Sequence, residues 1–186
     1  LSATPQQGKV GMNITIAGTG FPTNNFNGNS NTVTVAYQSG SAENSTTVSP
    51  DNNGNFSVVV QVPSGAAIPS TNTIIASYDL YTPNTSSSKQ GTVNTHSISH
   101  EVPSASLSIN PSSGSAGDAI GITGTGFKRY TTITSVTLGG VDATPFNPKP
   151  TTDTNGSISF EIIVPNGLPA GTQTATLEIG GTTSLT

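Results

Sequence analysis

The chain has 186 residues, of which 8% are charged; five are basic, nine are acidic, and none is cysteine. So few lysines and arginines argue against nucleic acid or anionic lipid as a partner, because both need many cations to neutralise phosphate. The absence of cysteine excludes disulfide bonds, thiol chemistry and cysteine-ligated zinc. No stretch approaches the roughly 18 apolar residues that a membrane span requires, so we expect no such span.

The composition favours an all-β protein of the cell exterior. There are 21 glycines and 13 prolines, and no window keeps the 3.6-residue apolar period of a helix. Thr, Ser and Asn supply most of the polar residues in place of charged ones. Such a composition is common on extracellular matrix and cell-surface proteins, so we expect an extracellular location at the cell surface.

Alternation of apolar and polar residues predicts the strands of the first half. Ile14 and Ile16 point one way while Asn13 and Thr15 point the other, which is the period of a half-buried strand. The polar stretch 22–31 is expected to be a solvated loop. Strands are predicted over 1–4, 12–17, 32–37, 45–48, 55–62, 72–78 and, more weakly, 91–98.

The motif Gly18-Thr19-Gly20-Phe21 follows the second of these strands and returns as Gly124-Thr125-Gly126-Phe127. The glycines allow a sharp turn with positive φ, and the phenylalanine is placed to fill the end of the core. A second signal, Asn53-Gly54 and later Asn155-Gly156, precedes an apolar strand in each half. Asn-Gly is a hairpin-turn signal, because both positions tolerate positive φ.

These motifs belong to an internal duplication. Leu1 aligns with Leu107, and Pro5, Gly8 and Gly11 align with Pro111, Gly114 and Gly117 at the same offset. Ordered blocks at nearly constant offsets indicate a repeat. We therefore predict two domains, 1–102 and 103–186, each close to the size of an immunoglobulin-like β-sandwich.

The second half is expected to repeat the strand order of the first. The junction 101–105 is short and contains Pro103, which favours an extended backbone. We therefore expect an elongated, stiff pair of domains. Strands of the second half are predicted over 106–109, 119–123, 135–138, 157–164 and 173–179.

The pattern Pro-x-x-Gly-x-x-Gly, then alternating Ile, then Gly-Thr-Gly-Phe resembles the IPT/TIG group of immunoglobulin-like domains. It is carried by Pro5, Gly8, Gly11, Ile14, Ile16 and the motif at 18–21, and by their counterparts from Pro111 to Phe127. The resemblance implies tandem immunoglobulin-like sandwiches, as in secreted prokaryotic surface proteins. Because the shared residues are structural, it implies little about activity.

The second domain departs from this pattern at its end. Only residues 180–186 follow the strand that ends at Ile179, whereas such a domain usually has room for another full strand. Three explanations are open: the chain is cut short, the last strand is the short stretch 182–186, or a neighbouring chain donates a strand. Strand donation would produce a head-to-tail filament, because a heterologous contact that does not close continues indefinitely.

No workable set of catalytic residues is found, and no cofactor or metal is expected. His96 and His100 lie near the junction and are expected to be surface residues. On a strand they would be about 13 Å apart, too far to share a metal ion. The turns at Asp51 and Asp153 faintly resemble calcium loops, but each offers one carboxylate, so hairpin turns are favoured.

Five asparagines lie in N-glycosylation sequons, which makes this a candidate glycoprotein. The number of sequons is what the composition predicts by chance, so only their expected positions, on outward faces or in turns and loops, support them. The candidates are Asn13, Asn44, Asn55, Asn84 and Asn155.

The sequence therefore predicts a non-enzymatic, extracellular structural subunit of a filament, pilus-like fibre or surface layer, assembled with copies of itself and with a role in cell adhesion. The alternative is a spacer or carbohydrate-binding module of a larger secreted enzyme or adhesin. For a glycan ligand Tyr130 is the best aromatic candidate, because it lies in an expected loop.

Overall fold

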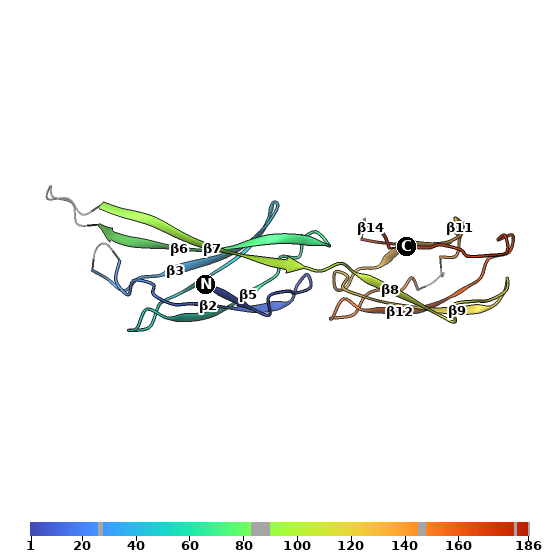
Figure 1. Ribbon diagram of the computed structural model, residues 1–186, viewed down its shortest axis with the longest axis horizontal. Coiled ribbons are helices and arrows are strands. Elements are labelled where there is room, and N and C mark those ends of the chain that lie inside the picture. Colours follow the sequence, from blue (N-terminus) through green and yellow to red (C-terminus); the bar gives the residue numbers. More distant parts are fainter. Residues whose placement is uncertain (26–27, 83–89, 145–147, 181, 186) are drawn as a thin grey trace. The chain divides into compact units, whose positions relative to one another are not determined.

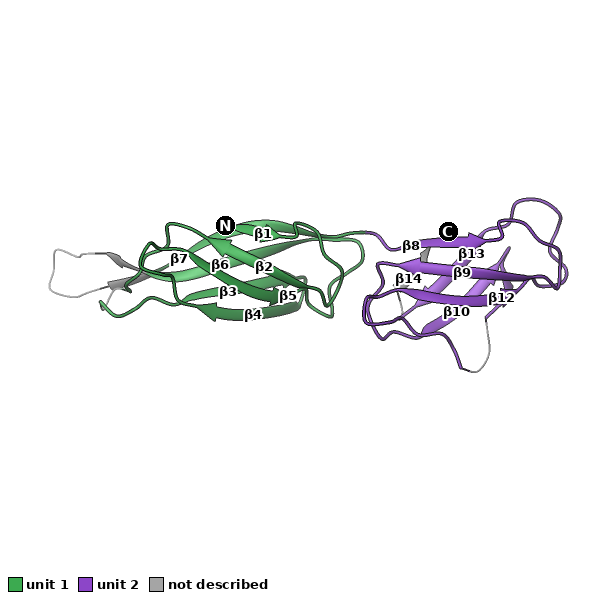
Figure 2. Cartoon of the chain, turned by 90° about the horizontal axis from the view of Figure 1, so that it is seen from below, with its two compact units in different colours: residues 1–103 green, residues 104–186 purple. Residues whose placement is uncertain are grey.

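A computed structural model describes residues 1–25, 28–82, 90–144, 148–180 and 182–185. The chain divides into two compact units, Leu1–Pro103 and Ser104–Thr186 (Figure 2). The described residues form strands and connecting loops and no helix, so the all-β fold class is confirmed (Figure 1). The immunoglobulin-like family assignment and the elongated arrangement stay predictions.

Unit 1 consists of two antiparallel sheets. One has the order β1 (Ser2–Thr4), β2 (Asn13–Gly18), β5 (Phe56–Gln61). The other has the order β4 (Ala42–Val48), β3 (Val33–Ser39), β6 (Ser70–Thr82), β7 (Gln90–Val102). The alternate residues of both sheets that point inward form one core, which includes Ile14, Ile16, Val33, Val35, Tyr37, Ile74 and Ala76.

Unit 2 repeats this strand order. Its three-stranded sheet is β8 (Ser106–Asn110), β9 (Ala119–Thr125), β12 (Ile158–Ile163). Its four-stranded sheet is β11 (Val141–Asp142), β10 (Ile133–Leu138), β13 (Ala175–Ile179), β14 (Thr182–Leu185). Each strand takes the place that its counterpart has in unit 1, and a separate core contains Ile120, Ile122, Ile133, Val136, Leu177 and Ile179.

The edge position that was expected to lack a strand is occupied by β14. Gly180 adopts a φ of 58° at the reversal, and β14 pairs with β13 through Leu177↔Leu185 and Ile179↔Thr182. The structure therefore shows a short strand, within the stretch 182–186, at this edge. It is far shorter than β7, its counterpart, which has 13 residues.

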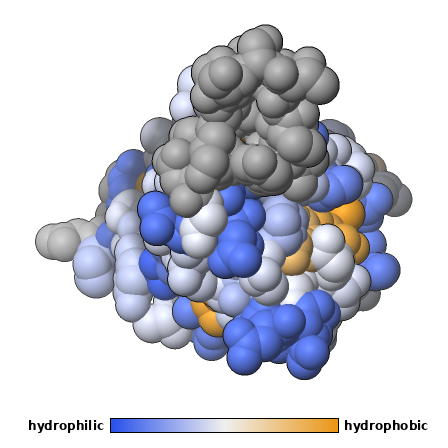
Figure 3. Space-filling view, turned by 90° about the vertical axis from the view of Figure 1, so that its left-hand side faces the viewer, coloured by the Kyte–Doolittle hydropathy of each residue, from blue (hydrophilic) through white to orange (hydrophobic). Residues whose placement is uncertain are grey.

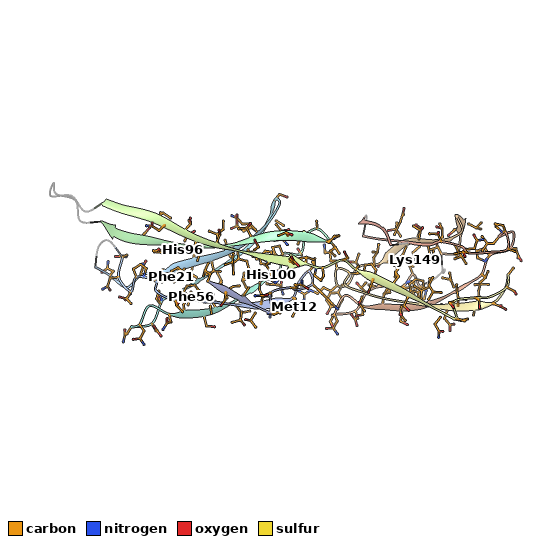
Figure 4. All side chains as sticks on the ribbon, viewed as in Figure 1. Met12, Phe21, Phe56, His96, His100 and Lys149 are labelled. Atoms are coloured by element: carbon orange, nitrogen blue, oxygen red, sulfur yellow. The ribbon has the colours of Figure 1, made fainter. Side chains whose placement is uncertain are left out.

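The Gly-Thr-Gly-Phe motif forms a corner at the end of β2. Only the second glycine has positive φ, 75° at Gly20 and 90° at Gly126. Gly18 is needed for a different reason, since a Cβ there would overlap the ring of Phe56 and lie 2.7 Å from that of Phe21. The two rings pack edge to face with centroids 4.8 Å apart (Figure 4).

The Asn-Gly turn completes this corner. The Phe21 N–H donates to the Gly54 carbonyl at 2.9 Å, and the Phe21 carbonyl oxygen lies where a side chain on Gly54 would be. Phe127 and Gly156 repeat both contacts, with the hydrogen bond at 3.1 Å. The sequence motif and the turn signal are therefore two halves of one structural feature.

Gly54 and Gly20 provide a matched test of this packing, because both have φ of 75°. Gly20→Ala should cost about 1–2 kcal/mol for the left-handed backbone alone, because no atom lies within 4 Å of the added Cβ. Gly54→Ala should cost at least about 3 kcal/mol, because its Cβ would also lie 2.5 Å from the Phe21 carbonyl oxygen. Urea unfolding of both variants measures the difference, and equal costs would contradict the role given to the corner.

Candidate functional sites

His100 is buried, which corrects the expectation that it is a junction surface residue. The predicted last strand of the first half ended at 98, but β7 continues to Val102, so strand alternation carries His100 into the core with 1% exposure. His96 is exposed as expected. Its Nε2 lies 3.1 Å from the Tyr78 hydroxyl, and the two rings stack.

His100 belongs to a buried polar network that spans three strands. The Asn72 amide donates to the Tyr37 hydroxyl oxygen at 3.2 Å, and that hydroxyl lies 2.8 Å from His100 Nδ1. Because the hydroxyl oxygen accepts from Asn72, its one hydrogen is available for Nδ1. If the hydroxyl donates this hydrogen to Nδ1, the neutral imidazole carries its proton on Nε2. Nε2 is buried and has no hydrogen-bond partner among the described residues.

Burial keeps this network uncharged. It lowers the pKa of His100, and the Pro5 carbonyl and the charge of Glu101 offset the effect only in part. Burial likewise raises the pKa of Tyr37, against a smaller opposing effect of the Asn72 hydrogen bond. Tyr37 and His100 are 0% and 1% exposed, so a substrate has no access to them and the network acts as a structural element.

The buried imidazole predicts that unit 1 is sensitive to acid. Since the pKa of His100 is lower in the folded state than its ordinary value of about 6.5, the unfolded state binds more protons below that pH. The stability of unit 1 should therefore be fully present above about pH 6.5 and fall as the pH decreases toward 5. Hydrogen exchange of β3 and β7 across this range measures the effect.

In His100→Phe this pH dependence should be much flatter, even if the variant is less stable at neutral pH. His96→Phe is the matched control, because it removes a histidine from the same strand and leaves His100 in place. An equal slope in the wild type and His100→Phe would show that another group causes the effect.

A groove of about 620 Å³ lies where β1 meets the end of β7. In its lining the Gln7 side chain donates to the Glu101 carboxylate at 2.8 Å, and the Gly8 N–H donates to the Glu101 carbonyl at 3.0 Å. The groove mixes apolar and amide groups and contains no nucleophile–base pair. It is lined by Leu1, Ser2, Ala3, Pro5, Gln6, Gln7, Ile98, Ser99 and Glu101.

The turns that resemble calcium loops use their carboxylates as backbone caps. Asp51 Oδ1 accepts the N–H groups of Asn55 and Asn53 at 2.8 and 2.9 Å, and these hydrogen bonds, that of Asn55 above all, lower the pKa of Asp51. Asp153 makes the same two bonds in unit 2. No group of three or more potential metal ligands occurs within the described part of the chain.

The sequon asparagines differ in how accessible their side chains are. Asn13 and Asn155 are exposed, whereas Asn44 and Asn55 are half-buried. Asn44 lies within β4, not in a loop, and its amide nitrogen donates to the Gln61 carbonyl at 2.9 Å. Asn84 lies outside the described residues. Glycosylation of these positions stays a prediction.

Tyr130 projects from a loop of unit 2 that is firmly held. Its side chain is 65% exposed, and its φ of 52° is the only positive value at a non-glycine residue among those described. Thr152, which is 2% exposed, secures the loop, because its hydroxyl donates to the Lys128 carbonyl at 2.7 Å and accepts the Thr131 N–H at 2.8 Å.

Three of the five cations of the chain lie on or beside this loop. Lys128 is exposed and Arg129 is half-buried. Lys149 is exposed and donates to the Thr134 carbonyl at 2.8 Å (Figure 4). The Tyr130 loop, residues 128–131, therefore combines an exposed aromatic ring with positive charge, in a protein that is otherwise poor in both.

The chain as a whole has few charged residues, 8% of the sequence. In Figure 3, which faces one end of unit 1, the coloured residues are mostly hydrophilic or intermediate, with a few small hydrophobic spots. The chain matches no protein-family model, and comparison with curated proteins and with solved structures finds no match. Within the residues that the structure describes, no helix has the length and hydrophobicity to cross a membrane.

Proposed function

We propose that the chain is a non-enzymatic structural subunit of the cell exterior, part of a filament, pilus-like fibre or surface layer with an adhesive role. The observation that carries the proposal is the repetition of one strand order in two compact all-β units. The immunoglobulin-like, IPT/TIG-type assignment is part of this proposal.

The chemistry of the described side chains supports this role. The one buried network that contains titratable groups is closed to substrates, and the exposed polar residues are mostly hydroxyls and amides. A surface of this kind contacts water and neighbouring subunits without long-range charge repulsion. It also suits an extracellular glycoprotein, for which Asn13 and Asn155 are the exposed candidate positions among those that the structure describes.

Assembly by strand donation remains part of the proposal in modified form. The place of a donated strand is held by β14, which among the described residues pairs with β13 at two registered positions. A strand from another copy would therefore have to displace β14, and a longer strand could do so by making more backbone hydrogen bonds along β13.

Electron microscopy of the purified chain at increasing concentration tests the structural role. Filaments or ordered arrays are the expected result. A peptide with the sequence of residues 180–186 should inhibit assembly if strands are exchanged at β13, whereas a scrambled peptide should not. A chain that stays monomeric at every concentration would contradict the proposal.

The Tyr130 loop supports the second candidate function, a carbohydrate-binding or spacer module. Backbone strain at an exposed aromatic residue is typical of functional positions, because the surrounding structure must maintain it. Here the buried Thr152 does so. A sugar ring stacked on Tyr130, with Lys128 and Arg129 nearby, favours an acidic saccharide over a neutral one.

A glycan array that carries neutral and acidic oligosaccharides tests this candidate. Tyr130→Ala should weaken binding about tenfold or more, whereas Tyr130→Phe should retain most of it, because stacking needs the ring and not the hydroxyl. Val59→Ala, at a residue of unit 1 that is 53% exposed, is the control. Equal binding by the wild type and Tyr130→Ala, or none by either, would rule out this loop as the site.

A further inference from the structure

β7 is the longest edge strand among the described residues. It has 13 residues, and it lies at the end of the four-stranded sheet of unit 1 with β6 as its only strand neighbour in that sheet. The pairing with β6 runs without a register shift from Ser70↔Val102 to Thr82↔Gln90. The other side of this regular strand is therefore a long row of backbone donors and acceptors.

Glu101 shows which backbone groups point to the open side. Its carbonyl accepts the Gly8 N–H at 3.0 Å, and its own N–H donates to the Gln6 carbonyl at 3.4 Å, on the side away from β6. Because successive residues of a strand alternate in direction, the groups of every second residue before Glu101 point the same way. These residues are 91, 93, 95, 97 and 99, and no described strand pairs with them on this side.

This edge lacks the features that usually protect one. Lysine, proline and bulges commonly block edge pairing, and residues 90–99 contain no proline and no Lys, Arg, Asp or Glu. Val93, with 66% exposure, is the most exposed large hydrophobic residue that the structure describes. By contrast, the edge strand β4 carries Glu43, and its Asn44 covers part of the edge of β5 by binding the Gln61 carbonyl.

We propose that β7 pairs with β7 of a second copy of this chain, antiparallel and centred on Thr95, and so joins two four-stranded sheets into one. Thr95 is the middle residue of the open groups that the structure describes, 91 to 99, so a two-fold pair centred on it places 95 opposite 95, 93 opposite 97 and 91 opposite 99. Every outward N–H and C=O from 91 to 99 then has a partner.

The side chains are compatible with pairing to an identical strand. Thr95 would lie opposite Thr95 and Val93 opposite Ser97, which are neutral cross-strand pairs on the exposed face. Residues 90–99 have no charged group that would oppose its own copy, and His96 is the only titratable one. The inference rests on the proposed structural role in one respect, because an array at the cell surface would supply the local concentration that a dimer needs.

The absence of cysteine allows a direct test of the register. In Thr95→Cys the two introduced residues would have Cα atoms about 5.5 Å apart, which is within the range of a disulfide. In Ser99→Cys they would be about 27 Å apart, because eight residues separate them along the strands. Mild oxidation of each full-length variant, followed by non-reducing electrophoresis, should give a covalent dimer for Thr95→Cys and none for Ser99→Cys.

Thr95→Lys supplies a second measurement. Two lysines would face each other at the centre of the pair, so the dimer fraction in sedimentation velocity should fall about tenfold or more. Thr47→Lys, at an exposed residue of β4, should leave it unchanged. Circular dichroism checks that all four variants stay folded.

Equal crosslinking at both positions, a dimer that survives Thr95→Lys, or the lack of any dimer would overturn the inference. So would an edge that captures an unrelated extended peptide while the chain itself stays monomeric. Filaments without a Thr95→Cys crosslink would remove only this contact. A crosslinked dimer without filaments or arrays would remove the proposed function and leave the contact in place.

Discussion

The fold of each unit depends on the contact between a phenylalanine backbone and a glycine that has no side chain. The Phe21 N–H donates to the Gly54 carbonyl, and the Phe21 carbonyl oxygen packs against the Gly54 backbone, where a side chain would otherwise be. These two contacts fix the end of β2 to the turn that begins β5. The same residue directs its ring toward Phe56, and also toward Tyr78 on β6 of the opposite sheet, at a centroid distance of 5.1 Å. One residue thus joins a turn, its own sheet and the facing sheet, and Phe127 repeats the backbone part of this arrangement with Gly156.

The features that the sequence predicts well are those that depend on a few consecutive residues. Alternation at Ile14 and Ile16 identifies β2 because the buried face of a strand has a strict period of two. The turn glycines are recognisable because positive φ excludes most other residues. Gly18 shows the limit of this reasoning, since what requires glycine there is the space taken by two rings, one of them from a distant strand.

The features that the sequence does not reveal depend on partners far away along the chain. His100 is buried because β7 continues beyond 98. Its polar ring is tolerated there because it hydrogen-bonds to the Tyr37 hydroxyl, which in turn accepts a hydrogen bond from Asn72, and these two residues lie on two other strands. Thr152 and Asn31 are similar cases. Asn31 ends the stretch 22–31 that was expected to be a solvated loop, and Thr152 lies between two predicted strands, 135–138 and 157–164. Both are nevertheless 2% exposed and donate to backbone carbonyls of residues far along the chain. The sequence around these two residues does not distinguish them from the many exposed Thr and Asn residues of this chain.

The two units are most alike at the corners and differ most at the edges of their four-stranded sheets. β7 and β14 hold the same place in their sheets, but β7 offers a long open edge, whereas β14 pairs with its neighbour at two positions. Only 8% of the residues are charged, and the large hydrophobic residues that are exposed in the described part are few. Few side chains can therefore contribute charged or hydrophobic contacts to a specific interface with another copy. For such an interface the open backbone groups of an edge strand are the strongest recognition element. Divergence in edge length would then let one unit associate where the other does not, while the corners keep both folds the same.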